Sequence, residues 1–162
     1  MTKQISDILK GRSGRKIITL TPNHNLADAV EIMARHNIHH IPIIEADSDK
    51  DSPNGRLQGI ISDRDLRLHS RSPFDYGPGV RNNNDTMEKA VSDIMNDLNN
   101  HTISTIMTKS MVLTLKEDDS IINAIDVMKE ADVSAIIITK DKNEIVDIVT
   151  RTDIMDVLKS IL

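Results

Sequence analysis

Two short motifs bring a carboxylate and a hydroxyl group close together along the chain. Asp65 follows Ser62 by three positions, and Asp153 follows Thr150 by the same interval. An ionised carboxylate can accept hydrogen bonds from both hydroxyls of a vicinal diol, and such charge-assisted bonds contribute about 1.5–3 kcal/mol each. Few other ligand groups offer two donors so close together. Both motifs are therefore candidate sites for a ligand that carries a diol.

The predicted elements around the two motifs also favour an anion. Each aspartate lies where a strand is followed by a helix, and the unpaired N–H groups at the start of a helix attract negative charge. Ser62, Thr150 and Thr152 can donate from their hydroxyl groups. Arg64 can neutralise a phosphate. The plainer alternative is that the two aspartates only cap the helices that follow them.

Three aspartates at alternate positions, Asp47, Asp49 and Asp51, are similar to the start of a calcium-binding loop. The pattern then fails, because Ser52 stands where such a loop needs glycine and Gln58 stands where it needs glutamate. We interpret this segment as a solvated hairpin loop.

Three histidines lie close together in the sequence, at His36, His39 and His40. Imidazoles are common metal ligands, but these three are expected to straddle the end of a helix and the start of a strand, so their directions diverge. Their spacing also differs from the two-histidine motif of zinc helices. We predict no metal site here, and we place His40 on the wall of a cleft.

A basic cluster near the amino terminus surrounds two glycines. Its members are Lys10, Arg12, Arg15 and Lys16. The cluster could reach phosphate groups or RNA, but a solvated loop is the simpler interpretation because the chain is acidic overall. The sequence contains no Gly-Lys-Thr, Gly-Lys-Ser or Gly-x-Ser-x-Gly. Asp63 and Asp65 lack a histidine or metal set around them, so no catalytic residue is predicted.

The composition narrows the class of protein. The 162 residues carry 20 Lys and Arg against 25 Asp and Glu, a formal net charge of -5, which disfavours nucleic acid as a partner. One Phe, one Tyr and no Cys leave little for base stacking and exclude cysteine chemistry. No apolar stretch is long enough for a signal sequence or a membrane span. We expect a soluble, cytoplasmic protein of one compact domain or two closely packed halves.

The helices that must position the two motifs occur twice. An apolar stripe at positions i, i+3, i+4 and i+7 runs through 26–33 and recurs through 121–128, an offset of 95 residues (121 − 26). Asn25 and Ser120 stand immediately before these stripes and are good N-caps. The sequence therefore predicts two helices that begin at equivalent places.

Short apolar runs follow each helix and are interpreted as strand pairs. These runs cover 38–44 and 57–61 in the first copy and 133–139 and 145–149 in the second. Asn54-Gly55 is a turn signal within the first pair. A closing helix follows each motif, and a short strand opens each copy at a Thr-Leu pair. Each copy is thus predicted as β-α-β-β-α, a mixed α/β (α+β) fold.

A linker separates the copies. Segment 70–80 is rich in Pro, Gly and Ser and is predicted as a loop, whereas 86–98 has apolar residues at helical spacing. Asp85 and Glu88 are placed as an N-cap and its partner at the third helical position. This added helix either covers the core or contacts a second chain.

Taken together, these motifs resemble the CBS domain pair. Ile38-His39-His40-Ile41-Pro42-Ile43-Ile44 is similar to the H-x-P-V-V strand of that family. The run from Gly59 to Leu66 is similar to its G-h-h-[ST]-x-x-D-h signature, and segments 5–9 and 103–107 are similar to its opening V-x-D-I-M. Residues 62–67 and the long linker are most similar to the acetoin-utilisation-type CBS proteins.

The resemblance covers nearly the whole chain and implies its organisation. It places repeat 1 at 1–69, a linker at 70–102 with a helix at about 86–98, and repeat 2 at 103–162. It also implies that the repeats pack face to face through their sheets with pseudo-twofold symmetry, and that two such chains form a homodimer.

The resemblance further implies the function of the clefts between the repeats. They are expected to bind AMP, ADP, ATP or another adenosyl ligand, with the aspartates on ribose hydroxyls and nearby Ser or Thr on phosphate. The chain is then a regulatory energy sensor without catalysis, acting on an unknown partner protein. The predicted ligand-binding residues are Thr19, Ile38, His40, Ile41, Pro42, Ser62, Arg64, Asp65, Thr114, Val133, Ala135, Ile136, Thr150, Thr152 and Asp153.

The second copy departs from the family pattern. Asp147 stands where the family has glycine, and Glu117 stands where the first copy has Pro22. A charged side chain at Asp147 can narrow the site or repel a nucleotide, so we expect unequal clefts. Two other functions stay open: a scaffold with empty clefts, and a hydrolase that uses Asp63 and Asp65.

Overall fold

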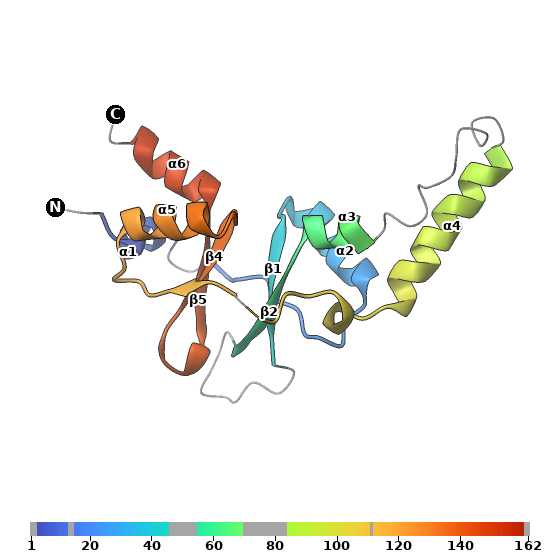
Figure 1. The fold of residues 1–162 in the computed structure, drawn as a ribbon, viewed down its shortest axis with the longest axis horizontal. Helices are drawn as coiled ribbons and strands as arrows, with labels where there is room; N and C mark the ends of the chain where they lie inside the picture. The colour runs from blue at the N-terminus through green and yellow to red at the C-terminus, as the bar shows by residue number, and fades with distance from the viewer. Residues whose placement is uncertain (1–2, 13–14, 46–54, 70–83, 111, 161–162) are drawn as a thin grey trace.

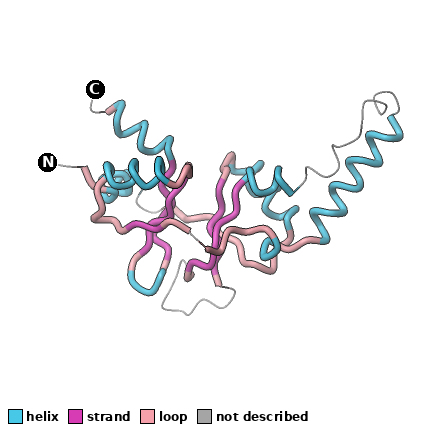
Figure 2. Tube along the Cα trace, in the orientation of Figure 1, coloured by secondary structure: helices cyan, strands magenta, loops and turns pink. Residues whose placement is uncertain are grey.

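The computed structural model describes residues 3–12, 15–45, 55–69, 84–110 and 112–160. Strands from both repeats meet near the centre of the molecule and helices lie around them (Figure 1, Figure 2). The predicted acidic loop, the Asn54 half of the predicted turn and the predicted 70–80 loop fall outside the described residues. Among the residues that are described, no helix is both long and apolar enough to cross a membrane.

The first repeat is a two-stranded antiparallel sheet with two helices. Its elements are α2 (Leu26–His36), β1 (His40–Ile44), β2 (Leu57–Ser62) and α3 (Asp63–His69). Asn25 caps α2 as predicted, because its side chain accepts a hydrogen bond of 2.8 Å from the Asp28 N–H. The predicted opening strand is reduced to one parallel bridge between Leu20 and Ile43.

The second repeat contains the full β-α-β-β-α order that the sequence predicts. Its elements are β3 (Thr114–Leu115), α5 (Ile121–Glu130), β4 (Ala135–Thr139), the short η4 (Asp141–Asn143), β5 (Ile145–Thr150) and α6 (Arg151–Lys159). β3 is parallel to β4, and β4 is antiparallel to β5. Ser120 caps α5 as predicted, with a hydrogen bond of 3.0 Å from the Asn123 N–H.

The two sheets share one register. His40 lies opposite Ser62 in the first repeat, and Ala135 lies opposite Thr150 in the second. Both strand pairs also have an irregularity at the equivalent place, after Ile43 and after Ile138. The repeat found in the sequence is therefore a repeat of backbone geometry as well.

The linker helix α4 (Asn84–Asn100) extends away from the first repeat (Figure 1). It begins before Asp85, which lies inside the first turn, so the prediction of Asp85 as its N-cap is wrong. Leu98 is buried in the core of the first repeat and Ile94 packs against it, whereas Val91 is 56% exposed. The carboxyl-terminal part of α4 thus covers the core.

The opening segment of each copy packs into the other copy's core. These segments are α1 (Ile5–Leu9) with η1 (Lys10–Arg12), and η3 (Ile103–Thr105). Ile5 and Ile8 belong to the core of the second repeat, and the Ile5 N–H donates to the Asp119 carbonyl at 2.9 Å. Ile103 belongs to the core of the first repeat and donates to the His24 carbonyl at 2.8 Å. This exchange ties the two repeats together.

Candidate functional site

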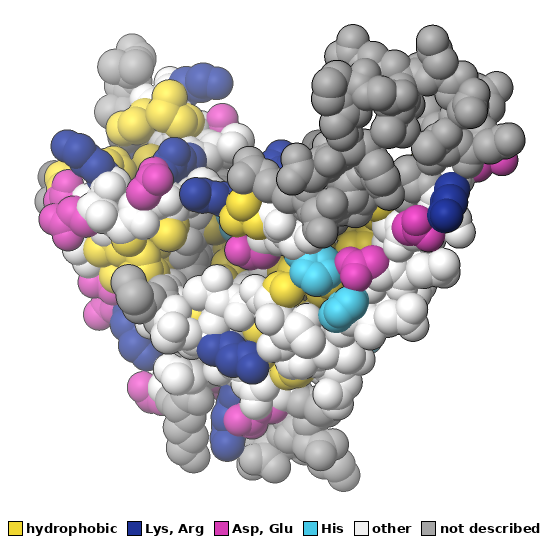
Figure 3. All heavy atoms as spheres, turned by 45° about the vertical axis from the view of Figure 1, so that its right-hand side comes forward, with side chains coloured by type: hydrophobic (Ala, Val, Ile, Leu, Met, Phe, Trp, Pro, Cys, Tyr) yellow, Lys and Arg dark blue, Asp and Glu magenta, His cyan; other side chains and the backbone are white. Residues whose placement is uncertain are grey.

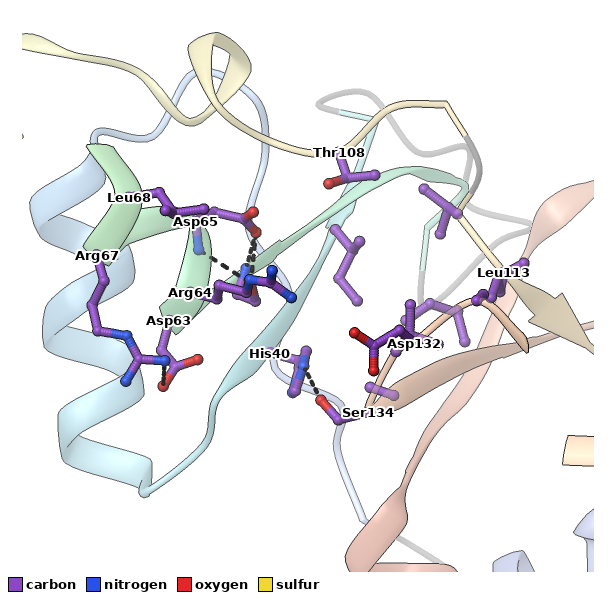
Figure 4. A pocket seen from close by; sticks show the side chains of 17 residues that line it. His40, Asp63, Arg64, Asp65, Arg67, Leu68, Thr108, Leu113, Asp132 and Ser134 are labelled. Carbon is purple, nitrogen blue, oxygen red and sulfur yellow. Dashed lines mark hydrogen bonds and ion pairs between the residues drawn. The ribbon is translucent and has the colours of Figure 1, made fainter. Parts of the chain in front are cut away.

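Two clefts lie between the repeats, each with a volume of about 540 Å³. This volume falls within the range of small-molecule sites, roughly 300–1,000 Å³. Each cleft combines the signature motif of one repeat with the strand start of the other. The first cleft includes Ser62, Arg64 and Asp65 on one side and Val133, Ser134 and Ala135 on the other (Figure 4). The second includes Thr150, Thr152 and Asp153 on one side and Ile38, His39 and His40 on the other.

Asp65 is the partner of the capping residue Ser62 at the start of α3, and it also lines the first cleft. Its Oδ2 accepts hydrogen bonds from the Ser62 N–H at 2.8 Å and from the Ser62 hydroxyl at 2.7 Å. Its Oδ1 accepts no hydrogen bond from any described residue, and the side chain is half-buried. Capping therefore uses one carboxylate oxygen and leaves the other for a ligand. The two interpretations of Asp65 from the sequence are compatible.

Asp153 has the same local geometry and a different environment. Its Oδ2 accepts from the Thr150 N–H and hydroxyl, both at 2.7 Å. Its Oδ1, however, forms an ion pair with the guanidinium of Arg12. Arg12 also donates to the Ile148 carbonyl at 3.1 Å and lies 3.5 Å from the Asp147 carboxylate. The carboxylate of the second cleft is thus already paired by the chain itself.

Asp147 is part of this ion-pair network. Its side chain is 11% exposed, and its Oδ1 accepts from the Ile148 N–H at 2.7 Å while Oδ2 faces Arg12. We expected Asp147 to narrow the second site or repel a nucleotide, whereas its charge is balanced by Arg12. The interpretation of Arg12 as part of a solvated loop is therefore wrong. The Arg12 guanidinium is 15% exposed because it fills the space between two carboxylates.

Gly59 occupies the equivalent position in the first repeat. A Cβ atom there would lie 2.7 Å from the Thr108 carbonyl oxygen. Ile60 and Thr108 exchange two backbone hydrogen bonds, of 3.0 and 2.9 Å, which bring the segment after η3 against β2. In the first repeat the backbone of Thr108 therefore packs beside this position. In the second repeat the side chains of Asp147 and Arg12 lie there instead. This difference leaves Oδ1 of Asp65 without a cationic partner among the described residues.

His40 borders both clefts. Its Nε2 lies 3.1 Å from the Ser134 hydroxyl, which belongs to the other repeat (Figure 4). Burial lowers the pKa of His40 below its usual value; the neighbouring imidazole of His39 adds to this, and the carboxylates of Asp63 and Asp65 oppose it. A neutral imidazole follows, which can donate or accept one hydrogen bond to a ligand.

The cations of the first cleft differ in their partners. Arg67 lies 3.3 Å from the Asp63 carboxylate, and His39 contacts the same oxygen at 3.3 Å. Arg64 is exposed, has no ion pair with any described residue and extends toward the side of the cleft where Asp132 lies (Figure 4). Its guanidinium is available to an anionic ligand.

Several predicted site residues lie elsewhere. Ile41, Pro42 and Ile136 have their side chains fully buried in the core, so these side chains line neither cleft. Thr19 and Thr114 are also absent from both linings. The hydroxyls of Ser62 and Thr150, expected as donors to phosphate, instead donate to the aspartates. The remaining predicted residues line one or both clefts.

The sequence interpretation also missed residues that line the first cleft. Among them are Ile60, Thr108 and Leu113. Thr108 comes from the segment after the second opening motif, which sequence spacing did not place near β2. Ile60 and Ile148 occupy matching places in the two clefts, and their offset of 88 (148 − 60) was the signal that could have found them.

Comparison with known proteins agrees with this arrangement. The sequence profile of the CBS domain matches residues 5–71 and 103–160. A CBS domain-containing protein of Dictyostelium discoideum is 29% identical over 155 residues, which cover 96% of this chain and 93% of the relative. Other curated relatives are longer: the chain spans 25% of several inosine-5′-monophosphate dehydrogenases, which it matches at 24–28% identity.

Solved structures with the same fold carry adenosyl ligands. The CBS domain pair of protein MJ0100, in complex with 5′-methylthioadenosine and S-adenosyl-L-methionine, matches with a TM-score of 0.67 at 25% identity over 100% of both chains. CBSX2 in complex with AMP matches with a TM-score of 0.69 at 18% identity over 98% of both chains. The two profile matches together cover most of this sequence, one on each structural repeat. The chain belongs to the CBS domain family.

Proposed function

We propose that the chain binds one adenine nucleotide or related adenosyl ligand, in the first cleft. The observation that carries this proposal is the contrast between the two signature aspartates. Oδ1 of Asp65 accepts no hydrogen bond from the described residues, whereas Oδ1 of Asp153 is paired with Arg12. A carboxylate oxygen has two lone pairs, so Oδ1 of Asp65 can accept both hydroxyls of a ribose.

The other walls of the first cleft suit the rest of such a ligand. Val133 and Ala135 supply an apolar surface for adenine, and the neutral His40 can hydrogen-bond to it. Arg64 favours a negatively charged end of the ligand. We therefore expect AMP, ADP or ATP to bind more tightly than S-adenosylmethionine, whose sulfonium is positive. The adenosyl ligands of the MJ0100 domain pair support the ligand class.

A ligand in this cleft would act as a regulatory signal. Because the cleft is lined by both repeats, a ligand contacts both and favours the arrangement that it binds best. The regulated protein is unknown. We propose that the chain is a homodimer joined through the exposed apolar surface of α5 and α6, and that it does no catalysis.

Calorimetric titration with AMP, ADP, ATP, S-adenosylmethionine and 5′-methylthioadenosine tests the proposal. We expect saturable binding of one ligand per chain, and a rise in melting temperature with the same ligands. Nucleotide recovered after prolonged incubation should be unchanged. Absence of binding by every ligand would favour the alternative of a ligand-free scaffold, and turnover of the nucleotide would favour a hydrolase.

A further inference from the structure

A cluster of two histidines and one aspartate lies outside both clefts. His69 is the last residue of α3, Asp97 is on α4, and His101 follows the end of α4. Nε2 of His69 lies 2.7 Å from Oδ2 of Asp97, and Nδ1 of His101 lies 3.1 Å from Oδ1 of the same carboxylate. One ligand atom from each residue lies within 4.8 Å of the other two. The two rings are 5.1 Å apart at an angle of 66°.

The fold holds these three side chains together from two separate elements. Asp97 and His101 are four residues apart, which places them on one side of the helix end. Leu98, between them, is buried in the core of the first repeat and fixes the rotation of α4. His69 reaches the cluster from α3, which packs against the same core through Leu66.

The cluster is reachable from solvent. Its side chains are 21% exposed at His69, 41% at Asp97 and 43% at His101. Histidine and acidic side chains gather on the surface that faces the viewer in Figure 3. An ion can therefore enter without unfolding the chain, and one coordination position can stay open to water.

We propose that His69, Asp97 and His101 bind a divalent transition-metal ion, with Zn²⁺ as the preferred ion. Two imidazoles and a carboxylate are a common zinc ligand set, and a fourth position is often left to water. Bond lengths of about 2.0–2.1 Å place neighbouring ligand atoms of a tetrahedral site about 3.3 Å apart. The contacts of 2.7 and 3.1 Å use different oxygens of Asp97, and the three ligand atoms lie within 4.8 Å of one another, so side-chain movements are needed to bring them to this spacing.

Metal binding would replace hydrogen bonds that the cluster now makes. Nδ1 of His101 also lies 2.9 Å from the main-chain oxygen of Asp97, and this contact has to be given up. Zinc binds the deprotonated forms of these ligands, so protons and zinc compete for the same atoms. The bound ion would join the end of α3 to the end of α4 and so restrain the linker helix.

Titration of the full, untagged, chelator-treated chain with ZnCl₂ tests this proposal. We expect one Zn²⁺ per chain by calorimetry, a higher melting temperature with Zn²⁺, and no such effect of Mg²⁺, which prefers oxygen ligands. Co²⁺ in the same site should give the strong visible absorption of tetrahedral coordination.

Matched glutamine variants locate the ion. His69→Gln and His101→Gln should each weaken zinc binding at least 10-fold, whereas His36→Gln, at an exposed histidine of α2, should bind as the unchanged chain does. Far-ultraviolet circular dichroism verifies that each variant is folded. Equal affinity in all three variants, or absence of saturable binding by the unchanged chain, would mean that the cluster is only a set of hydrogen bonds.

Discussion

The two signature aspartates have the same local geometry and different partners. Through Oδ2, each accepts hydrogen bonds of 2.7–2.8 Å from the backbone and hydroxyl of the residue that caps its helix. Within the part of the chain that the structure describes, only Asp153 is also paired with an arginine. At this scale, sequence similarity between the motifs does not make the two sites equivalent. The partner of Oδ1 decides which aspartate can serve a ligand.

Replacing Arg12 with alanine should destabilise the protein. Asp147 and Asp153, 11% and 19% exposed, would lose their shared cation. Leaving mostly buried charges unpaired costs on the order of 1–3 kcal/mol here, with allowance for their partial exposure. Urea unfolding at neutral pH measures this loss. Arg15→Ala, at an exposed arginine, is the control and should change stability by less than about 0.5 kcal/mol. Equal stability of the two variants would contradict the assigned role of Arg12.

His40 should make the protein less stable in acid. Burial lowers its pKa in the folded state below the ordinary value of 6.5, so the unfolded chain binds the proton more tightly. Neutral His40 contributes to the free energy of unfolding. This contribution is fully present above about pH 6.5 and is lost as the pH falls below that value. His40→Gln should reduce the loss of unfolding free energy between neutral pH and about pH 5.5. His36→Gln should keep the loss seen in the unchanged chain. A variant at His40 with an undiminished loss would show that other groups cause it.

At the scale of elements, the segment after η3 packs closely against β2 because residue 59 is a glycine and has no side chain. A Cβ atom at Gly59 in β2 would lie only 2.7 Å from the Thr108 carbonyl oxygen, which is too close for a side chain. The backbone exchange between Ile60 and Thr108 depends on this close approach. Thr108 in turn lines the first cleft. A glycine in a strand thus shapes the ligand site.

Gly59→Ala should therefore cost about 1–3 kcal/mol, the usual penalty for forcing atoms into an occupied space. Gly11→Ala is the matched control, because a Cβ there meets nothing within 4 Å. We expect the control to be neutral or slightly stabilising in urea unfolding. Similar stability of both alanine variants would mean that the segment at Thr108 can shift without cost.

At the scale of the whole molecule, the outer helices expose an apolar surface. Ile122 is 59% exposed, Met155 53% and Leu158 40%, on α5 and α6. Apolar surface concentrated in this way is typical of a contact with another protein. Val91 on α4 is also exposed, so the linker helix is the competing candidate for a dimer contact.

Met155→Glu should convert a dimer into a monomer, because it would bury a charge at the centre of the proposed contact. Light scattering coupled to size exclusion measures the mass directly. Val91→Glu, at a residue of similar exposure, should leave the dimer intact. A monomer in Val91→Glu together with a dimer in Met155→Glu would place the dimer contact on α4 instead.

Much of the fold could be predicted because its signals are local. The apolar stripe after Asn25 predicted a helix, and α2 does begin at Leu26. The apolar stripe after Ser120 likewise predicted α5, which begins at Ile121. Features made by distant segments could not be predicted. The pairing of Arg12 with Asp153 joins residues 141 positions apart (153 − 12), and the exchange of opening segments is equally non-local.

The candidate site was predicted only in part for a related reason. Ile41 and Ile136 lie in strands whose residues are apolar on both faces, so the sequence did not indicate which side chains face the cleft. Both are fully buried, whereas Val133 and Ala135 line the first cleft. Both motifs lie at the start of a helix and line a cleft, with Ser62 and Thr150 as the caps and the aspartates as their partners at the third helical position. The pairing of Asp153 differs from that of Asp65 because of Arg12, which is distant in the sequence.

The most direct test compares Asp65→Asn with Asp153→Asn by calorimetric titration with the tightest-binding nucleotide. Both substitutions disturb an equivalent helix cap, so they serve as controls for each other. We predict that Asp65→Asn weakens binding about 10- to 150-fold, while Asp153→Asn leaves affinity and stoichiometry unchanged. Loss of binding in Asp153→Asn with unchanged affinity in Asp65→Asn would contradict the assignment of the ligand to the first cleft.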